Sequence, residues 1–260
     1  VGLGFMGSFF RLLRPLQPSI KEDALKRIDT HSLVSSLSWS LPLHPPAVSV
    51  LASAVQLDPQ GVREAVARAR EEGKGPGLAA ELGKFFSGEC EEVVEVVKAL
   101  VDPETLHDLS SATTFLLPFL SDLLPYLSSS LRMGDLMGSL EVVNYVVRCW
   151  PNEAAMEWGE VLEGVLERCR EVDTHVKLAG LRLLRTILSL PKPPVDDLIR
   201  VDFFRKIESM FDPTCDNLVG SVIIEICEHI REEKVPTKKL TALRRYLQEG
   251  WSAKFREWGE

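Results

Sequence analysis

Residues 173–184 read DTHVKLAGLRLL, and this stretch carries the clearest fold signal in the chain. Aspartate is a favoured helix N-cap, because its carboxylate accepts hydrogen bonds from the free N–H groups of the first turn. Apolar residues then recur at three- and four-residue steps, the pattern of an amphipathic helix. Ala179 and Gly180 are small enough to let a neighbouring helix approach closely. The stretch therefore predicts a helix that begins at Asp173 and packs tightly against another helix.

A second stretch repeats this start 43 residues later, where Asp216 is followed three residues on by Val219. N-cap residues or first-turn prolines in this half of the chain fall 21, 21, 22 and 20 residues apart. These expected helix starts are Asn152, Asp173, Pro194, Asp216 and Pro236. Two helices per unit give a repeat of about 42 residues, which is typical of arrays of stacked helix pairs.

The first half of the chain shows the same helical periodicity, less regularly. Helices are predicted over four segments: 60–72, 80–86, 89–101 and 135–150. Asp-Pro pairs at Asp58, Asp102 and Asp212 predict further helix starts, since proline at the first helical position loses no hydrogen bond. The β-branched runs 91–97 and 221–226 are assigned to helices because their flanks are helical and charged.

The residues of 173–184 resemble the second helix of a HEAT repeat, in which an aspartate is followed by Val-Arg or Val-Lys, a small residue and leucines. Asp216-Asn-Leu-Val219 resembles the same start, although Gly220 stands where that family has a basic residue. The resemblance implies an all-α fold, a right-handed α-solenoid of HEAT/armadillo-like helix pairs. We expect one domain over 1–260, irregular over 1–150 and more regular over 151–260, with a capping helix at its C-terminal end.

Residues 150–230 are also similar to the family of the smallest subunit of the triple-T co-chaperone complex. The similarity rests on the helix over 177–190, the connector PPVDDLI at 193–199 and the long apolar helix after Asp216. It implies a subunit of a larger complex that helps to mature PI3K-like kinases.

Composition narrows the class of protein without revealing an activity. The 260 residues are 45% hydrophobic and 26% charged, which excludes collagen-like chains, disordered tails and small disulfide scaffolds. A formal net charge of −8 argues against general nucleic-acid binding, which depends on many Lys and Arg contacts to phosphate. Prolines divide the most apolar stretches, 32–57 and 112–131, so no transmembrane segment is expected and the second is predicted to be a kinked, buried helix.

The five cysteines form an odd set with no C-x-x-C pair, which is typical of reduced, intracellular proteins of the cytoplasm or nucleus. They are Cys90, Cys149, Cys169, Cys215 and Cys227. Cys227 and His229 point to different sides of a helix, so no metal site is expected.

One motif favours an enzyme. Gly2-Leu-Gly4-Phe-Met-Gly7 resembles the dinucleotide loop of β-hydroxyacid dehydrogenases, which would make the chain an NAD(P)-binding oxidoreductase fragment. Only Val1 precedes the motif, however, and Pro15 and Pro18 interrupt the helix that should follow it. No nucleophile elbow, P-loop or H-E-x-x-H is present, and the histidines are scattered singly. We therefore expect no catalysis, no cofactor and no small-molecule substrate.

With no catalytic motif assigned, the function is expected to lie in exposed side chains that bind other proteins. Such residues are predicted on three helices. Basic Arg182 and Arg185 face outward on the first, and acidic Glu225 and Glu228 on the second; the two stripes either pair with each other or form a charged groove for a partner. The C-terminal helix adds Lys238, Lys239, Arg244 and Arg245, which could contact nucleic acid or an acidic peptide weakly. A second motif, the L-x-x-L-L box Leu120–Leu124, matches either a docking helix or a core-facing one. The sequence thus predicts a non-catalytic scaffold or adaptor that binds other proteins.

Overall fold

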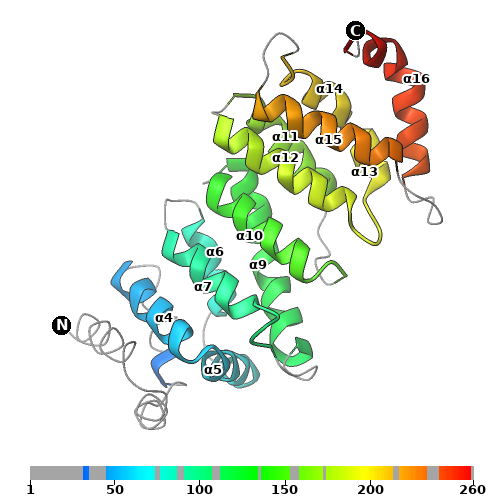
Figure 1. Ribbon diagram of the computed structural model, residues 1–260. Helices are drawn as coiled ribbons and strands as arrows, with labels where there is room; N and C mark the ends of the chain where they lie inside the picture. Colours follow the sequence, from blue (N-terminus) through cyan, green and yellow to red (C-terminus); the bar gives the residue numbers. More distant parts are fainter. Residues whose placement is uncertain are drawn as a thin grey trace. The chain divides into compact units, whose positions relative to one another are not determined.

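The residues that the computed structural model describes form helices joined by turns and short loops, and they contain no strand (Figure 1). The described residues are 32–34, 45–73, 77–86, 91–106, 112–133, 136–152, 158–171, 174–212, 217–232 and 240–258. This confirms the predicted all-α class. Contacts divide the chain into two compact units, Val1–Val142 and Val143–Glu260, and the boundary between them falls within one helix.

The first unit contains pairs of helices that pack against each other. Its elements are α4 (Pro45–Leu57), α5 (Pro59–Glu71), α6 (Leu78–Phe85), α7 (Glu91–Val101), the π-helix η1 (Ala112–Leu116), α9 (Leu117–Met133) and the first half of α10 (Leu136–Cys149). Helix α4 lies against α7, and α6 lies against α9, while η1 contacts both α5 and α9. The predicted helices over 60–72, 80–86, 89–101 and 135–150 match α5, α6, α7 and α10, so these predictions are confirmed.

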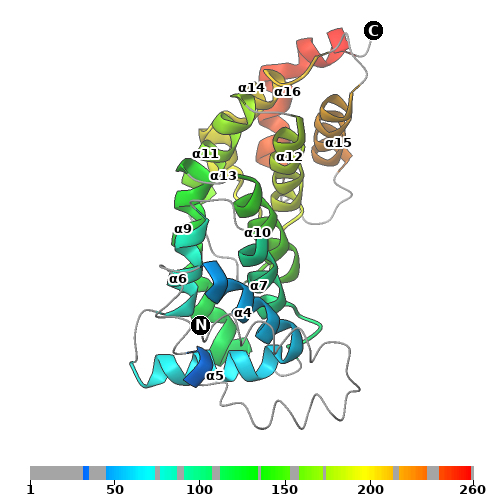
Figure 2. The same cartoon turned by 90° about the vertical axis from the view of Figure 1, so that its left-hand side faces the viewer.

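The second unit begins in α10 and forms two layers. It contains α11 (Trp158–Glu171), α12 (Thr174–Leu188), α13 (Val195–Arg200), α14 (Phe203–Glu208), α15 (Leu218–Glu232) and α16 (Thr241–Trp258). Helices α12 and α15 run side by side in the same direction, and α11 packs beneath α12 and against α13 and α14 (Figures 1 and 2). Helix α16 contacts α13 and α15.

Gly180 fixes how closely α11 and α12 approach. A Cβ added at Gly180 would overlap the Sγ atom of Cys169, which is buried on α11. The helices therefore meet where only a glycine fits, as the small residues at 179 and 180 had indicated. Burial also explains why α12 forms here, because Val176, Leu181 and Ile187, like Gly180, lie in the core.

Local capping explains where two of the predicted helix starts fall. The Asp58 carboxylate accepts a hydrogen bond from the Gly61 N–H at 2.8 Å, and Pro59 occupies the first turn of α5, as predicted. Asp216 lies outside the described residues, and α15 begins at Leu218, where the Asn217 side chain accepts from the Gly220 N–H at 2.8 Å.

The predicted helix start at Asp102-Pro103 is wrong. Helix α7 ends at Val101, and residues 103–105 form a turn instead of a new helix. The Asp102 carboxylate accepts from the Glu104 N–H at 3.0 Å, and Thr105 is held by Arg63, whose guanidinium donates to its carbonyl and hydroxyl oxygens. Aspartate and proline thus stabilise a tight turn here, a conformation that they favour as readily as a helix start.

Among the described residues, seven hydrogen-bonded pairs distant in the sequence join positions 39 to 44 apart. In the first unit such pairs are Ser49–Glu92, Arg63–Thr105, Phe86–Ser130 and Lys98–Glu141, and in the second they are Asn144–Thr186, Glu167–Lys206 and Asp202–Tyr246. Other separations also occur there: 36 and 37 from Arg63 to Ala99 and Leu100, 48 and 52 from Arg70 to Pro118 and Asp122, and 14 from Arg244 to Ile230. The common separation is close to the repeat of about 42 residues that the sequence predicts.

The helix predicted over 112–131 is present as the π-helix η1 followed by α9, with Pro125 inside α9. Leu120, Leu123 and Leu124 of the L-x-x-L-L box are all buried. The box therefore faces the core, and its alternative interpretation as a docking motif is wrong. No helix among the described residues is long and apolar enough to cross a membrane.

Candidate binding surface

The outward face of α12 is basic. Arg182, Arg185 and Ser189 are exposed there, while the apolar residues between them point into the core. Thr186, on the same side, donates to the Asn144 amide oxygen at 2.8 Å and so ties α12 to α10 within the second unit. Arg182 and Arg185 are exposed, as the sequence predicted, and Thr174 and His175 at the start of α12 are exposed as well.

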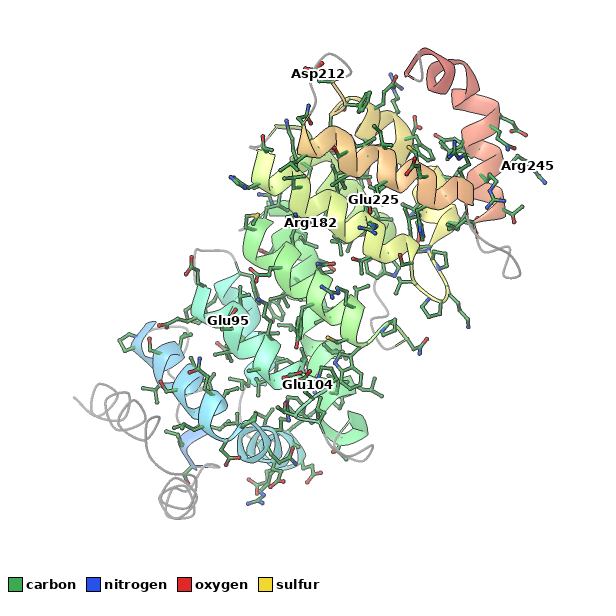
Figure 3. All side chains as sticks on the ribbon, viewed as in Figure 1. Glu95, Glu104, Arg182, Asp212, Glu225 and Arg245 are labelled. Atoms are coloured by element: carbon green, nitrogen blue, oxygen red, sulfur yellow. The ribbon has the colours of Figure 1, made fainter. Side chains whose placement is uncertain are left out.

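The outward face of α15 is acidic and partly apolar. Ser221 and Glu228 are exposed, and the side chain of Glu225 is 46% exposed. Two large aliphatic side chains add to this surface, since Leu218 is 67% and Ile224 48% exposed. Figure 3 shows Glu225 on α15, with Arg182 on the neighbouring α12.

One ion pair joins these two faces. The Nη2 atom of Arg185 lies 2.9 Å from Oε1 of Glu225, and both side chains are about half exposed. Arg182 and Glu228 have no ion pair or side-chain hydrogen bond within the part of the chain that the structure describes. The sequence left two alternatives open for these charges, pairing with each other or binding a partner. Arg185 and Glu225 pair with each other, whereas Arg182 and Glu228 remain available to bind a partner.

An exposed ion pair of this kind contributes little to stability, typically 0 to about 1 kcal/mol. Arg185 uses one of its five N–H donors in the pair, and Glu225 uses one of its two oxygens. Both groups can therefore accept further partners without breaking the pair. We call the surface formed by Arg182, Arg185, Glu225 and Glu228 the α12–α15 face.

The four basic residues predicted to bind a partner near the C-terminal helix differ in how far they are exposed. Lys238 and Lys239 lie outside the described residues. Arg244 is half-buried, and its Nε donates to the Ile230 carbonyl at 3.2 Å, near the C-terminal end of α15. Arg245 is exposed. Arg244 thus caps a neighbouring helix, which leaves Arg245 as the exposed member of the set among the described residues.

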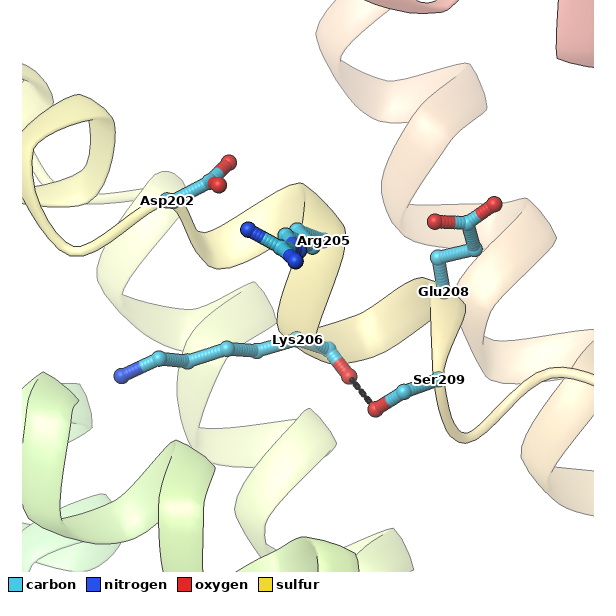
Figure 4. Close-up of a pocket in the computed structure, with 5 residues that line it drawn as sticks. All are labelled: Asp202, Arg205, Lys206, Glu208 and Ser209. Atoms are coloured by element: carbon cyan, nitrogen blue, oxygen red, sulfur yellow. Dashed lines mark hydrogen bonds between the residues drawn. The ribbon is translucent and has the colours of Figure 1, made fainter.

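A surface hollow of about 440 Å³ lies at α14 (Figure 4). Its lining residues are Asp202, Arg205, Lys206, Glu208 and Ser209. The Ser209 hydroxyl donates to the Lys206 carbonyl at 2.6 Å, and the Lys206 ammonium lies 3.2 Å from the Glu167 carboxylate on α11. Two acids and two bases share the hollow, so it has no dominant charge with which to select a ligand.

The structure brings no catalytic or metal constellation together among the residues it describes. No group of three or more His, Cys, Asp or Glu side chains could hold a metal ion there. His175 is exposed and His229 half-buried, on different helices. The glycine motif Gly2–Gly7 lies outside the described residues.

Three cysteines are described, and none of them forms a disulfide: Cys149, Cys169 and Cys227. Burial raises the pKa of Cys169 to about 11, against the opposing charges of Arg168 and Lys177. Burial, together with the charge of Glu228, raises the pKa of Cys227 to about 12. Thiols with such pKa values are almost wholly protonated at neutral pH, so these two are poor nucleophiles.

Two buried charged residues were missed by the sequence analysis. Arg63 on α5 is 1% exposed and donates to the carbonyls of Ala99 and Leu100, in the last turn of α7, at 2.9 and 2.8 Å. Glu81 on α6 is also 1% exposed, and its Oε1 lies 2.5 Å from the Lys84 ammonium. Each stands in an ordinary amphipathic pattern that gives no sign of a buried charge, so neither could be found without the fold.

The fold and this surface define an all-helical protein that presents a charged face and, within the described residues, no assembled reaction centre. Comparison with family models, with curated proteins and with solved structures found no match for the chain.

Proposed function

We propose that this chain is a non-catalytic scaffold or adaptor subunit, built as a right-handed α-solenoid of HEAT/armadillo-like helix pairs. The supporting observation is the sequence separation of long-range hydrogen bonds among the described residues, where seven pairs in both units recur at 39 to 44 positions. In a solenoid each repeat contacts only its neighbours, so contacts should recur at one repeat length. A compact bundle of unrelated helices has no reason to favour a single separation.

Such a scaffold acts by shape and charge complementarity along an exposed face, with no bond made or broken. The α12–α15 face is the candidate surface, because it combines exposed charged side chains with the exposed aliphatic side chains Leu218 and Ile224. The resemblance of residues 150–230 to the triple-T subunit family favours a particular assembly, in which the chain serves as a co-chaperone subunit for PI3K-like kinases.

Affinity purification of the tagged chain from its native cell, followed by quantitative mass spectrometry, tests the proposal. We expect stoichiometric co-purification of at least one protein, and recovery of a PI3K-like kinase or its co-chaperones would support the assembly named above. Retention of partners but consistent absence of those proteins would reject the co-chaperone assignment. A chain that purifies alone at native expression levels would contradict the scaffold function itself.

A further inference from the structure

The α12–α15 face has a charge pattern with a defined direction. Arg182 and Arg185 stand three residues apart on α12, and Glu225 and Glu228 stand three residues apart on α15. Because the two helices run side by side in the same direction, the face has a basic side and an acidic side that extend along the same axis (Figure 1).

The spacing of these charges matches a helix better than an extended strand. Three residues advance about 4.5 Å along an α-helix, whereas residues on one face of a strand are about 6.6 Å apart. A helix laid along the α12–α15 face can therefore place side chains at i and i+3 or i+4 opposite both members of each pair.

The occupant must also carry both signs of charge. A purely acidic segment would be repelled by Glu225 and Glu228, and a purely basic one by Arg182 and Arg185. Arg185 and Glu225 keep free donors and a free oxygen while paired with each other, and Arg182 and Glu228 are exposed without an ion pair among the described residues. All four groups can thus engage a ligand at once.

We propose that the α12–α15 face binds a partner helix that presents two acidic side chains, one turn apart, to Arg182 and Arg185 and two basic side chains to Glu225 and Glu228. This inference rests on the proposed scaffold function and adds the chemistry and orientation of the partner segment. The exposed aliphatic side chains Leu218 and Ile224 stand on the same helix as the acidic pair, where they supply apolar contact.

The test uses the full chain, expressed in its native cell, with a photo-crosslinking amino acid at Ser189 or Ser221. Both residues are exposed, one at the end of α12 and one on α15. Glu163, which is exposed on α11, serves as the control position. Mass spectrometry then identifies the partner peptide that each position captures. We expect Ser189 and Ser221 to capture one helical segment with acidic and basic residues on opposite flanks, and Glu163 to capture it far less.

A polarity-swapped variant gives the second readout. The substitutions R182E, R185E, E225R and E228R keep the net charge and the internal pair but reverse the direction of the pattern. We expect at least a tenfold loss of crosslinked partner, because each expected contact becomes repulsive. R182Q with E228Q, which leaves the Arg185–Glu225 pair untouched, should cause a several-fold loss and guards against a folding defect in the larger variant.

The outcomes separate the two proposals. Crosslinks from Ser189 and Ser221 to a segment without the two-sided charge pattern, or an unchanged yield in both variants, would overturn the inference while the scaffold function stands. The same holds if partners co-purify but crosslink only at Glu163. A wild-type chain that captures no partner at any position and purifies alone would overturn the scaffold function.

Discussion

Arg63 shows how a single buried charge organises the first unit. Its guanidinium satisfies carbonyls at the C-terminal end of α7 and in the turn that follows, where helix ends favour positive charge. Burial lowers the pKa of Arg63, while the carboxylate of Asp102 opposes that shift. The side chain nevertheless stays protonated, as arginine does in proteins.

Replacing Arg63 by Met should destabilise the protein by about 3–5 kcal/mol, because it leaves several buried carbonyls without a donor. Arg63→Lys keeps the charge but loses the forked geometry, so we expect an intermediate loss. Urea unfolding monitored by circular dichroism measures both. A loss below about 1 kcal/mol for Arg63→Met would show that water replaces the guanidinium without cost.

Gly180 allows a second prediction at this scale. Gly180→Ala should destabilise by about 1–3 kcal/mol through overpacking against Cys169, although alanine is the better helix former. The double variant with Cys169→Ala should recover part of the loss, because the overlapping sulfur is gone. Gly250→Ala is the matched control, since no atom lies within 4 Å of an added Cβ there; it should stabilise by about 0.5–1 kcal/mol. Equal effects at 180 and 250 would refute close packing at Gly180.

The raised pKa values of Cys169 and Cys227 predict how the stability of the fold and the reactivity of these thiols depend on pH. The pKa of Cys169 is raised to about 11 and that of Cys227 to about 12, both above the ordinary value of 9.0. A raised pKa favours the neutral thiol in the folded state, so this stabilisation is complete below pH 9 and is lost as the pH rises through these values. At pH 8 both thiols should react with a disulfide reagent much more slowly in the folded chain than in urea. Equal rates, read for each cysteine by mass spectrometry, would contradict their burial.

At the scale of the element, α16 is held to the second unit by a small set of contacts. The Tyr246 hydroxyl donates to the Asp202 carboxylate, and the Tyr246 ring stacks on Phe204 with centroids 5.9 Å apart. Leu243 and Leu247 are buried on the same helix. These contacts attach α16 to α14 and to the turn before it.

Tyr246→Phe removes the hydrogen bond and keeps the ring, so it should cost about 1–2 kcal/mol. Hydrogen exchange should accelerate in α16 before it changes in α12, because only the docking of α16 is weakened. Arg245→Gln, an exposed change on the same helix, is the control and should leave exchange unaltered. If exchange in α16 stays at the wild-type rate in Tyr246→Phe, the hydrogen bond does not hold this helix.

The sequence predicted helices correctly where apolar residues recur strongly at helical spacing. It misplaced one helix start, at a residue pair that is compatible with either a helix start or a turn. Helices α5, α6, α7 and α10 follow from their three- and four-residue patterns. Asp102-Pro103 could begin a helix or a turn, and the tertiary contact from Arg63 accompanies the turn. The charged stripes of α12 and α15 were predicted as exposed, but which charges pair depends on helix spacing that no sequence pattern specifies. The hydrogen bond from Arg244 to the end of α15 could not be predicted either, because it also depends on how the helices are placed.

At the scale of the whole molecule, the central claim is that helix pairs stack in sequence order with a repeat near 42 residues. In a solenoid each repeat is too small to bury its apolar face alone, so stability comes from contacts between neighbouring repeats. The observed separations of long-range hydrogen bonds agree with this arrangement inside each unit. The proposed solenoid would continue this stacking of helix pairs along the full chain.

Lysine-directed chemical crosslinking of the purified monomer, analysed by mass spectrometry, tests this claim most directly. Reactive lysines are spread along the chain, among them Lys84, Lys98, Lys177 and Lys206. Stacking in sequence order predicts intramolecular crosslinks between residues within about two repeats of each other and essentially none between the first and last thirds of the chain. Abundant crosslinks that join residues before 100 to residues after 200 in the monomer would contradict it.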